Sequence, residues 1–187
     1  MKKSKIIFTF NSPVVLCFAL LSLAALGLNI LTGGTTNRLI FSVYRSGMSP
    51  MSILRLFFHA AGHSSFSHYV SNIAFILALG PIVEERYGSW RLLFMFAVTA
   101  LVSGLFHIFF GGNTMLLGAS CIVYMLIFLA STSGSRPGEI PLTLVAVAAL
   151  YLTQEILGGL FTVSNISHLS HIVGGICGAV LGLFRHR

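Results

Sequence analysis

Charged residues are scarce in this chain of 187 residues: they make up 8% of the sequence, and only four of them are acidic. Soluble domains average about 25% charged residues, so this chain has too few to cover a water-facing surface. The scarcity of charge therefore excludes an ordinary soluble domain. Hydrophobic residues make up 56% of the chain, and the mean hydropathy is +0.92. We predict an all-α integral membrane protein, because helices satisfy their own backbone polar groups inside a bilayer.

Other scarcities exclude further classes. The three cysteines, Cys17, Cys121 and Cys177, lie in apolar stretches, so we expect no disulfide framework. The net charge of +7 comes from basic residues scattered along the loops, and this pattern does not indicate a nucleic-acid partner. No acidic residue lies among the first 83, and no His-Glu-x-x-His pattern occurs, so we expect no metal site. We assign His59 and His63 to packing and hydrogen bonding.

Six apolar stretches have the character of membrane helices. The expected spans are Pro13–Leu31, Phe66–Val83, Leu92–Phe110, Ala119–Ser131, Pro141–Leu157 and Ser170–Phe184. The fourth and sixth look too short to cross about 30 Å, so we expect them inside a bundle. The first lacks a small-x-small cleavage site after it, and we interpret it as a retained span. Thr32–Ser65 is rich in apolar residues, and we expect it to form a structured, partly membrane-embedded outer lobe. We expect one domain over residues 1–187.

The basic residues predict an orientation. With residues 1–12 inside, the inner segments hold Lys2, Lys3, Lys5, Arg86, Arg91, Arg136, Arg185 and Arg187. The outer segments hold only Arg38, Arg45 and Arg55. The positive-inside rule therefore favours a multi-pass protein with both termini in the cytoplasm, in the plasma (cell inner) membrane.

Polar residues within the spans are costly and mark candidate sites. His68 and Asn72 lie four residues apart on one face of the second span, where they can donate to an oxyanion or bond two helices together. Ser120 begins the fourth span, two residues after Gly118 and four before Tyr124. Backbone N–H groups are unpaired at such a helix start, so an anion can bind there.

The sixth span carries His171 on the same face as Gly174 and Gly178. This glycine spacing permits close approach of another helix, and if that helix is the fourth span, His171 can reach Ser120. His168 shares the face and is the alternative base. Outside these spans, Glu84 and its neighbour at position 85 are expected to form ion pairs at the inner surface.

Together these motifs resemble the rhomboid family of intramembrane serine proteases, in its basic six-span type. The matching segments are His68-Tyr-Val-Ser-Asn72, Gly80-Pro-Ile-Val-Glu84-Glu85-Arg86-Tyr-Gly88-Ser89, Ser103-Gly104, Gly118-Ala-Ser120-Cys121-Ile-Val-Tyr124 and His171-Ile-Val-Gly174-Gly175-Ile-Cys-Gly178. The upstream histidines also match, and the resemblance extends from about residue 38 to residue 182. Two positions depart from the family pattern: Cys121 replaces the usual glycine after the nucleophile, and Leu54-Arg55 replaces a Trp-Arg pair.

The resemblance implies an endopeptidase that cleaves transmembrane segments of other proteins through an acyl-enzyme. Ser120 is then the nucleophile and His171 its general base. The oxyanion is held by His68, Asn72 and the Ser120 N–H. Tyr124 packs against the His171 ring, Gly118 lets the substrate backbone approach, and no cofactor is implied.

Two other functions stay open at this stage. The first is an inactive rhomboid relative that binds membrane proteins, and the cysteine at position 121 is the main reason to consider it. The second is a channel or transporter, but the internal repeats common in transporters do not occur in this sequence.

Overall fold

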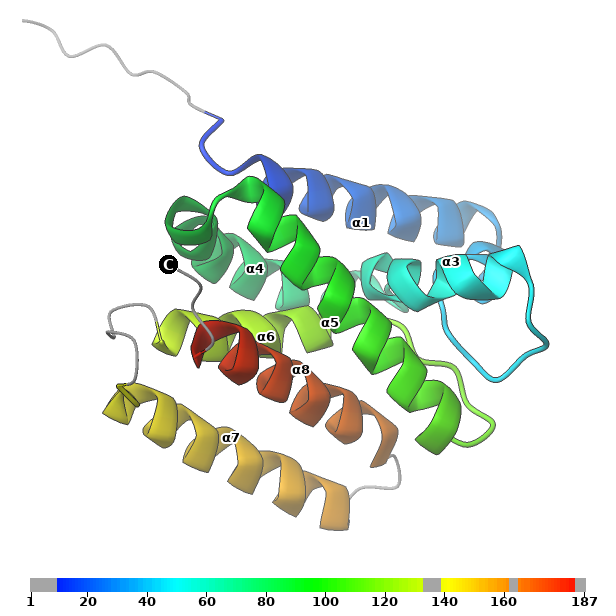
Figure 1. Ribbon diagram of the computed structural model, residues 1–187. Coiled ribbons are helices and arrows are strands. Elements are labelled where there is room, and N and C mark those ends of the chain that lie inside the picture. Colours follow the sequence, from blue (N-terminus) through cyan, green and yellow to red (C-terminus); the bar gives the residue numbers. More distant parts are fainter. Residues whose placement is uncertain (1–9, 133–138, 162–164, 184–187) are drawn as a thin grey trace, which may run out of the picture.

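The computed structural model describes residues 10–132, 139–161 and 165–183, and these ranges form eight α-helices and one short 3₁₀ helix, η1 (Figure 1). In chain order the helices are α1 (Pro13–Leu31), α2 (Thr35–Leu39), α3 (Pro50–Phe58), η1 (His59–Ala61), α4 (Phe66–Tyr87), α5 (Ser89–Phe110), α6 (Ser120–Ser131), α7 (Leu142–Phe161) and α8 (Asn165–Leu183). The β-type pairing in those ranges is one isolated bridge between Val43 and Leu116. The predicted all-α class is confirmed.

Three helices, α1, α4 and α5, are long and apolar enough to cross a membrane. Their outward side chains are largely apolar: Leu31 is 84% exposed and Phe94 is 62% exposed. A water-facing helix would carry polar residues at such positions, whereas lipid accepts apolar ones. The chain is therefore an integral membrane protein, as its composition predicts.

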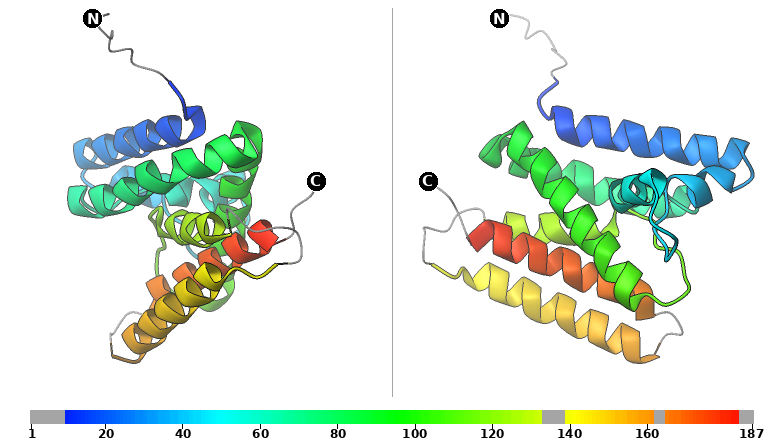
Figure 2. Two further views of the ribbon diagram at one scale, coloured as in Figure 1. Left: turned by 90° about the vertical axis from the view of Figure 1, so that its left-hand side faces the viewer. Right: turned by 45° about the vertical axis from the view of Figure 1, so that its right-hand side comes forward.

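The short helix α6 lies inside the bundle, between α1 at one edge and α7 at the other (Figures 1 and 2). It packs against α4, α5, α7 and α8. Four of its side chains, Cys121, Met125, Leu126 and Leu129, have no exposed surface. Surrounding helices thus shield α6 on all sides, as expected for a helix of 12 residues. The beginning of α1 and the end of α8 lie at the same end of the bundle.

Three of the predicted helix limits differ by four or five residues from the structure: α7 continues four residues past the predicted end at Leu157, to Phe161, and two other helices differ as follows. The second span does not break at Pro81 and continues four residues past Val83 to Tyr87, and Gly88 with φ of 82° separates it from α5. The sixth begins at Asn165, so α8 has 19 residues and is not short. Hydropathy locates the apolar part of a helix, but polar residues at the ends join the same hydrogen-bonded helix.

Several positions used for the sequence-based orientation lie outside the described residues. These positions are Lys2, Lys3, Lys5, Arg136, Arg185 and Arg187. The predicted span end at Phe184 also lies outside the described residues.

Tertiary contacts hold together the lobe between α1 and α4. Arg55 is only 8% exposed, and its Nε donates to the Leu39 carbonyl at 2.8 Å. The same guanidinium lies 4.6 Å from the centre of the Tyr44 ring. Asn37 Nδ2 donates to the His63 carbonyl at 2.9 Å and so joins the two ends of the lobe. Leu54, at the family's Trp position, is 46% exposed, so the arginine carries the anchoring contacts.

Glu84 contradicts the expectation of a surface ion pair. Its carboxylate is 3% exposed and accepts the backbone N–H groups of Val14 at 3.0 Å and Val15 at 3.1 Å. The Ser89 hydroxyl also donates to it, at 2.7 Å. The first N–H groups of a helix have no partner within the helix, and Ser12 makes no side-chain cap, so Glu84 caps α1 from another part of the chain. Glu85 remains exposed.

Candidate active site

The loop before α6 is held by main-chain bonds to the lobe. Val43 and Leu116 exchange two N–H···O bonds of 2.9 Å, and the Gly118 N–H donates to the His59 carbonyl at 2.9 Å. The His59 ring in turn donates from Nε2 to the Ala100 carbonyl of α5 at 3.0 Å. These contacts fix the loop on both sides and so set where Ser120 begins α6.

The His68 ring lies directly against this loop. At Gly118, φ is +126°, and a Cβ would come within 2.9 Å of the His68 Cε1 and Nε2 atoms. Any other residue at 118 would therefore be strained and would collide with the ring. The absence of a side chain at Gly118 therefore makes room for the His68 ring, and the approach of a substrate backbone at this glycine stays a prediction.

The first turns of α4 orient His68 and Asn72. Ser65 caps the helix by accepting the His68 N–H at 3.1 Å, and the Ser64 Oγ lies 3.1 Å from His68 Nδ1. Asn72 is 7% exposed, and its Nδ2 donates to the His68 carbonyl at 2.9 Å. That bond uses one of the two amide protons, so the second is available to another acceptor.

Glycines on α8 bring its backbone against α6. A Cβ at Gly174 would collide with the carbonyl of Cys121, and one at Gly178 with the carbonyl of Met125. No side chain fits at either position, so the helices approach more closely here than two ordinary helices can. The helix that packs against Gly174 and Gly178 is therefore α6, which begins with Ser120. This is the neighbour that would let His171 reach Ser120.

This close packing stacks His171 on Tyr124. The ring centroids are 4.4 Å apart and the planes differ by 10°. Tyr124 follows Ser120 by one turn, so both lie on the face of α6 directed at α8. The contact between Tyr124 and His171 is the one expected from the sequence. His168 touches the edge of the His171 ring, with centroids 6.3 Å apart.

Ser170, which was not among the predicted site residues, supports the position of His171. Its hydroxyl is 2.8 Å from the Ser103 hydroxyl of α5, and both side chains are buried. The pair holds the start of the α8 glycine face against α5, immediately before His171. Its sequence signal was weak, because serine is common at contacts between membrane helices.

The two lobe histidines are buried and uncharged at neutral pH. Burial lowers the pKa of His59 to about 4, opposed in part by its bond to the Ala100 carbonyl. Burial, and then the nearby His68, lower the pKa of His63 to about 4. Across the described ranges, no three His, Cys, Asp or Glu side chains are arranged to hold a metal ion.

A family model described as Rhomboid domain matches residues 50–187. The chain belongs to the rhomboid family. Among curated proteins it is similar to the Rhomboid protease GlpG of Pectobacterium atrosepticum, with 32% identity over 67% of this chain and 47% of the relative. It also resembles the proteins of that name from Yersinia pestis, with 28% identity over 88% of this chain and 60% of the relative, and Serratia proteamaculans, with 29% identity over 69% and 48%. The chain spans about half the length of these relatives.

In this rhomboid, Cys121, which replaces the family's usual glycine, is fully buried. The atoms that meet Gly174 belong to the Cys121 backbone, which any residue would place there. The side chain has no exposed surface, and its thiol interacts with Ser103 on α5. The cysteine side chain is therefore accommodated inside the bundle, next to α5.

Proposed function

We propose that this rhomboid is an intramembrane serine protease that uses Ser120 as nucleophile and His171 as general base. Ser120 attacks the scissile carbonyl while His171 takes the hydroxyl proton and then returns it to the leaving amine. Water hydrolyses the resulting acyl-enzyme, with His171 again acting as the base. The stacking of His171 on Tyr124, one turn below Ser120, is the observation that carries this proposal.

The oxyanion that forms during attack needs hydrogen-bond donors, and two side chains of α4 can supply them. His68 lies against the loop that leads to Ser120, and Asn72 keeps one amide proton available. We assign these two groups and the Ser120 N–H, at the start of α6, to the oxyanion. In other enzymes, loss of one such donor costs roughly 10²–10³ in rate.

We propose a single domain with six spans and both termini in the cytoplasm, in the plasma membrane. The arrangement is supported by the beginning of α1 and the end of α8, which lie at the same end of the bundle. Arg86 and Arg91, which the positive-inside rule places inside, flank the α4–α5 turn at that end. The lobe and Ser120 then lie toward the outer side, from which water reaches the site.

The substrates proposed are transmembrane segments of other proteins. A helix must unwind locally before its backbone carbonyl can reach Ser120, so residues with poor helix propensity near the cut favour cleavage. The family name and the names of the relatives support this substrate class, and the chemistry requires no cofactor.

Fluorophosphonate labelling tests the proposal directly, since the probe reacts only with an activated serine. Purified protein in detergent is treated with the probe and, in parallel, incubated with a generic transmembrane substrate. We expect Ser120→Ala and His171→Ala to lose both labelling and cleavage. His168→Ala is the matched control, because this neighbour touches His171 but has no proposed role, and it should keep both.

Two outcomes would overturn the assignment. Labelling that survives Ser120→Ala would place the nucleophile elsewhere, and loss of labelling in His168→Ala with retention in His171→Ala would exchange the bases. A folded wild-type protein that shows neither labelling nor cleavage would instead favour a rhomboid that binds membrane proteins without cutting them.

A further inference from the structure

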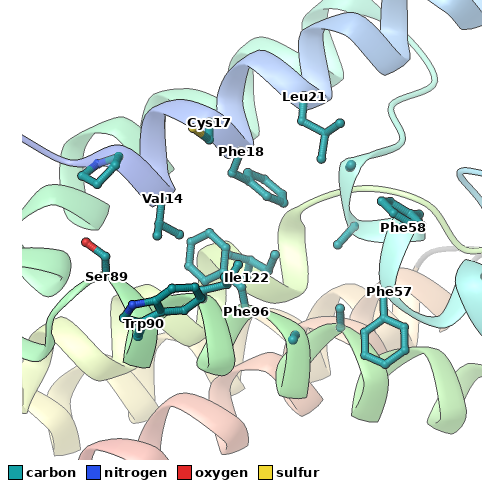
Figure 3. A pocket seen from close by; sticks show the side chains of 16 residues that line it. Val14, Cys17, Phe18, Leu21, Phe57, Phe58, Ser89, Trp90, Phe96 and Ile122 are labelled. Carbon is teal, nitrogen blue, oxygen red and sulfur yellow. The ribbon is translucent and has the colours of Figure 1, made fainter. Parts of the chain in front are cut away.

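A narrow apolar cavity lies between α1 and α5 (Figure 3), and neither Ser120 nor His171 lines it. Its volume is about 460 Å³. One wall is a stripe of α1 from Pro13 to Leu21, and the other is a stripe of α5 from Ser89 to Ala100. Phe57 and Phe58 of α3 close the far end. Apart from a serine and a cysteine, every lining residue is apolar. We call this cavity the α1–α5 slot.

The slot runs along the membrane-spanning helices. Eight residues of α1 and eleven of α5 separate its ends, which corresponds to roughly 12 and 16 Å at 1.5 Å per residue. The two walls touch each other within the slot: the Phe18 ring of α1 and the Phe96 ring of α5 pack edge to face, with centroids 5.3 Å apart. A helix is about 10 Å across, so neither a substrate helix nor a second copy's helix fits between walls this close. A single hydrocarbon chain is thin enough.

The end of the slot at Ser89 and Trp90 has the chemistry of a membrane interface. Trp90 lines the slot there and is 83% exposed, and tryptophan concentrates where hydrocarbon meets the headgroups. Arg86 and Arg91 are exposed at the same end of α4 and α5. The acidic residues of the α4–α5 turn at this end are Glu85, which is exposed, and Glu84, which is buried as the cap of α1. Positive charge at the mouth of a hydrocarbon-lined slot matches a lipid with an anionic headgroup.

We propose that the α1–α5 slot is a binding site for one acyl chain of an anionic phospholipid, drawn from the leaflet on the Arg86 and Arg91 side. The chain lies along α1 and α5 beside the touching Phe18 and Phe96 rings, and the phosphate group lies near the two arginines. Burial of apolar surface retains the chain, and the arginines select the headgroup. The proposal rests on membrane insertion alone and does not depend on proteolytic activity.

The single tryptophan of this chain makes the test specific, because Trp90 stands at the mouth of the slot. Lipids with brominated acyl chains quench tryptophan on contact. The protein is reconstituted into zwitterionic vesicles that contain a low, fixed fraction of brominated phosphatidylglycerol or of brominated phosphatidylcholine. We expect stronger quenching by the anionic lipid, with a preference of roughly fivefold for each arginine that the headgroup meets.

Two pairs of variants separate the slot from the general lipid surface. Ala97→Phe fills the slot from α5 and should abolish the excess quenching, whereas Ala78→Phe, on an exposed face of α4, should leave it unchanged. Arg91→Gln should reduce the headgroup preference by roughly fivefold, whereas Arg38→Gln, exposed on α2, should not.

Equal quenching by both lipids in the wild type would overturn the proposal. An excess that persists in folded Ala97→Phe would also overturn it, because the arginines would then be collecting lipid at the surface only. Arg91→Gln leaves the packing of the slot untouched, so even if Ala97→Phe does not fold, an unchanged headgroup preference in Arg91→Gln would overturn the proposal.

Discussion

Replacement of Gly174 by alanine should damage both the packing and the chemistry of this rhomboid. The added Cβ would lie 2.9 Å from the Cα and carbonyl carbon of Cys121, where ordinary contacts are 3.4–4 Å. Both partners are backbone, so neither can rotate away, and α8 must move by about 0.5–1 Å. We expect the free energy of unfolding to fall by about 1–3 kcal/mol, which is typical of an overpacked core.

The catalytic consequence is larger than the stability effect. His171 lies one turn before Gly174 on the same helix, so the shift moves its ring relative to Tyr124 and Ser120. A displacement of about 1 Å can cost roughly 10²-fold in rate when a catalytic group is misplaced. The rate of substrate cleavage and the rate of fluorophosphonate labelling should fall together, at a temperature where the variant is still folded.

Gly27→Ala is the matched control. This glycine lies in the interior of α1, and a Cβ there would meet nothing within 4 Å. Alanine favours the helix by about 0.5–1 kcal/mol, so this variant should be slightly more stable and fully active. A Gly174→Ala protein with wild-type cleavage would refute the reasoning, because α6 and α8 could then not be as close as the structure has them.

Two further predictions concern stability. Glu84→Gln leaves one donor at the start of α1 unsatisfied and removes a charge from the helix N-terminus, so the free energy of unfolding in detergent should fall by about 2–4 kcal/mol. Glu85→Gln should change this free energy little. Equal effects of the two substitutions would contradict the capping role of Glu84. His59 and His63 are neutral when folded, with a pKa of about 4, whereas their unfolded pKa is 6.5. Because the unfolded chain binds more protons between these values, acidification from pH 7 to 5 should lower the free energy of unfolding by about 2 kcal/mol for each histidine. Chemical denaturation at both pH values measures this loss of stability. His63→Gln should remove the part of the loss that comes from His63. A free energy of unfolding that does not change between pH 7 and 5 would refute the prediction.

Local patterns predicted much of this structure. The glycines at 174 and 178 recur at the helical period, so their common face could be recognised without knowing the partner helix. The packing of Tyr124 against His171 was implied by the resemblance to the rhomboid family, and not by the glycine pattern. Likewise, hydropathy located the first five predicted spans to within a few residues.

Contacts between distant segments could not be predicted in the same way. Glu84 looked like a surface charge because nothing near it in the sequence shows that α1 needs a cap. The close fit of His68 against Gly118 depends on the loop conformation, and the α1–α5 slot depends on how two separately formed helices cross. Each of these features is a property of tertiary packing and leaves no periodic signal in the chain.

The cap of α1 also bears on how the protein is made. Val14 leaves the ribosome 70 residues before Glu84, the group that completes its helix. At roughly 5–20 residues per second, the ribosome needs about 4–14 s to synthesise that stretch. The first helix must therefore enter the membrane with its N-terminal N–H groups still hydrated, and it acquires its final partner only when the α4–α5 turn arrives. Biogenesis of this rhomboid accordingly includes a period in which α1 is inserted but not yet docked.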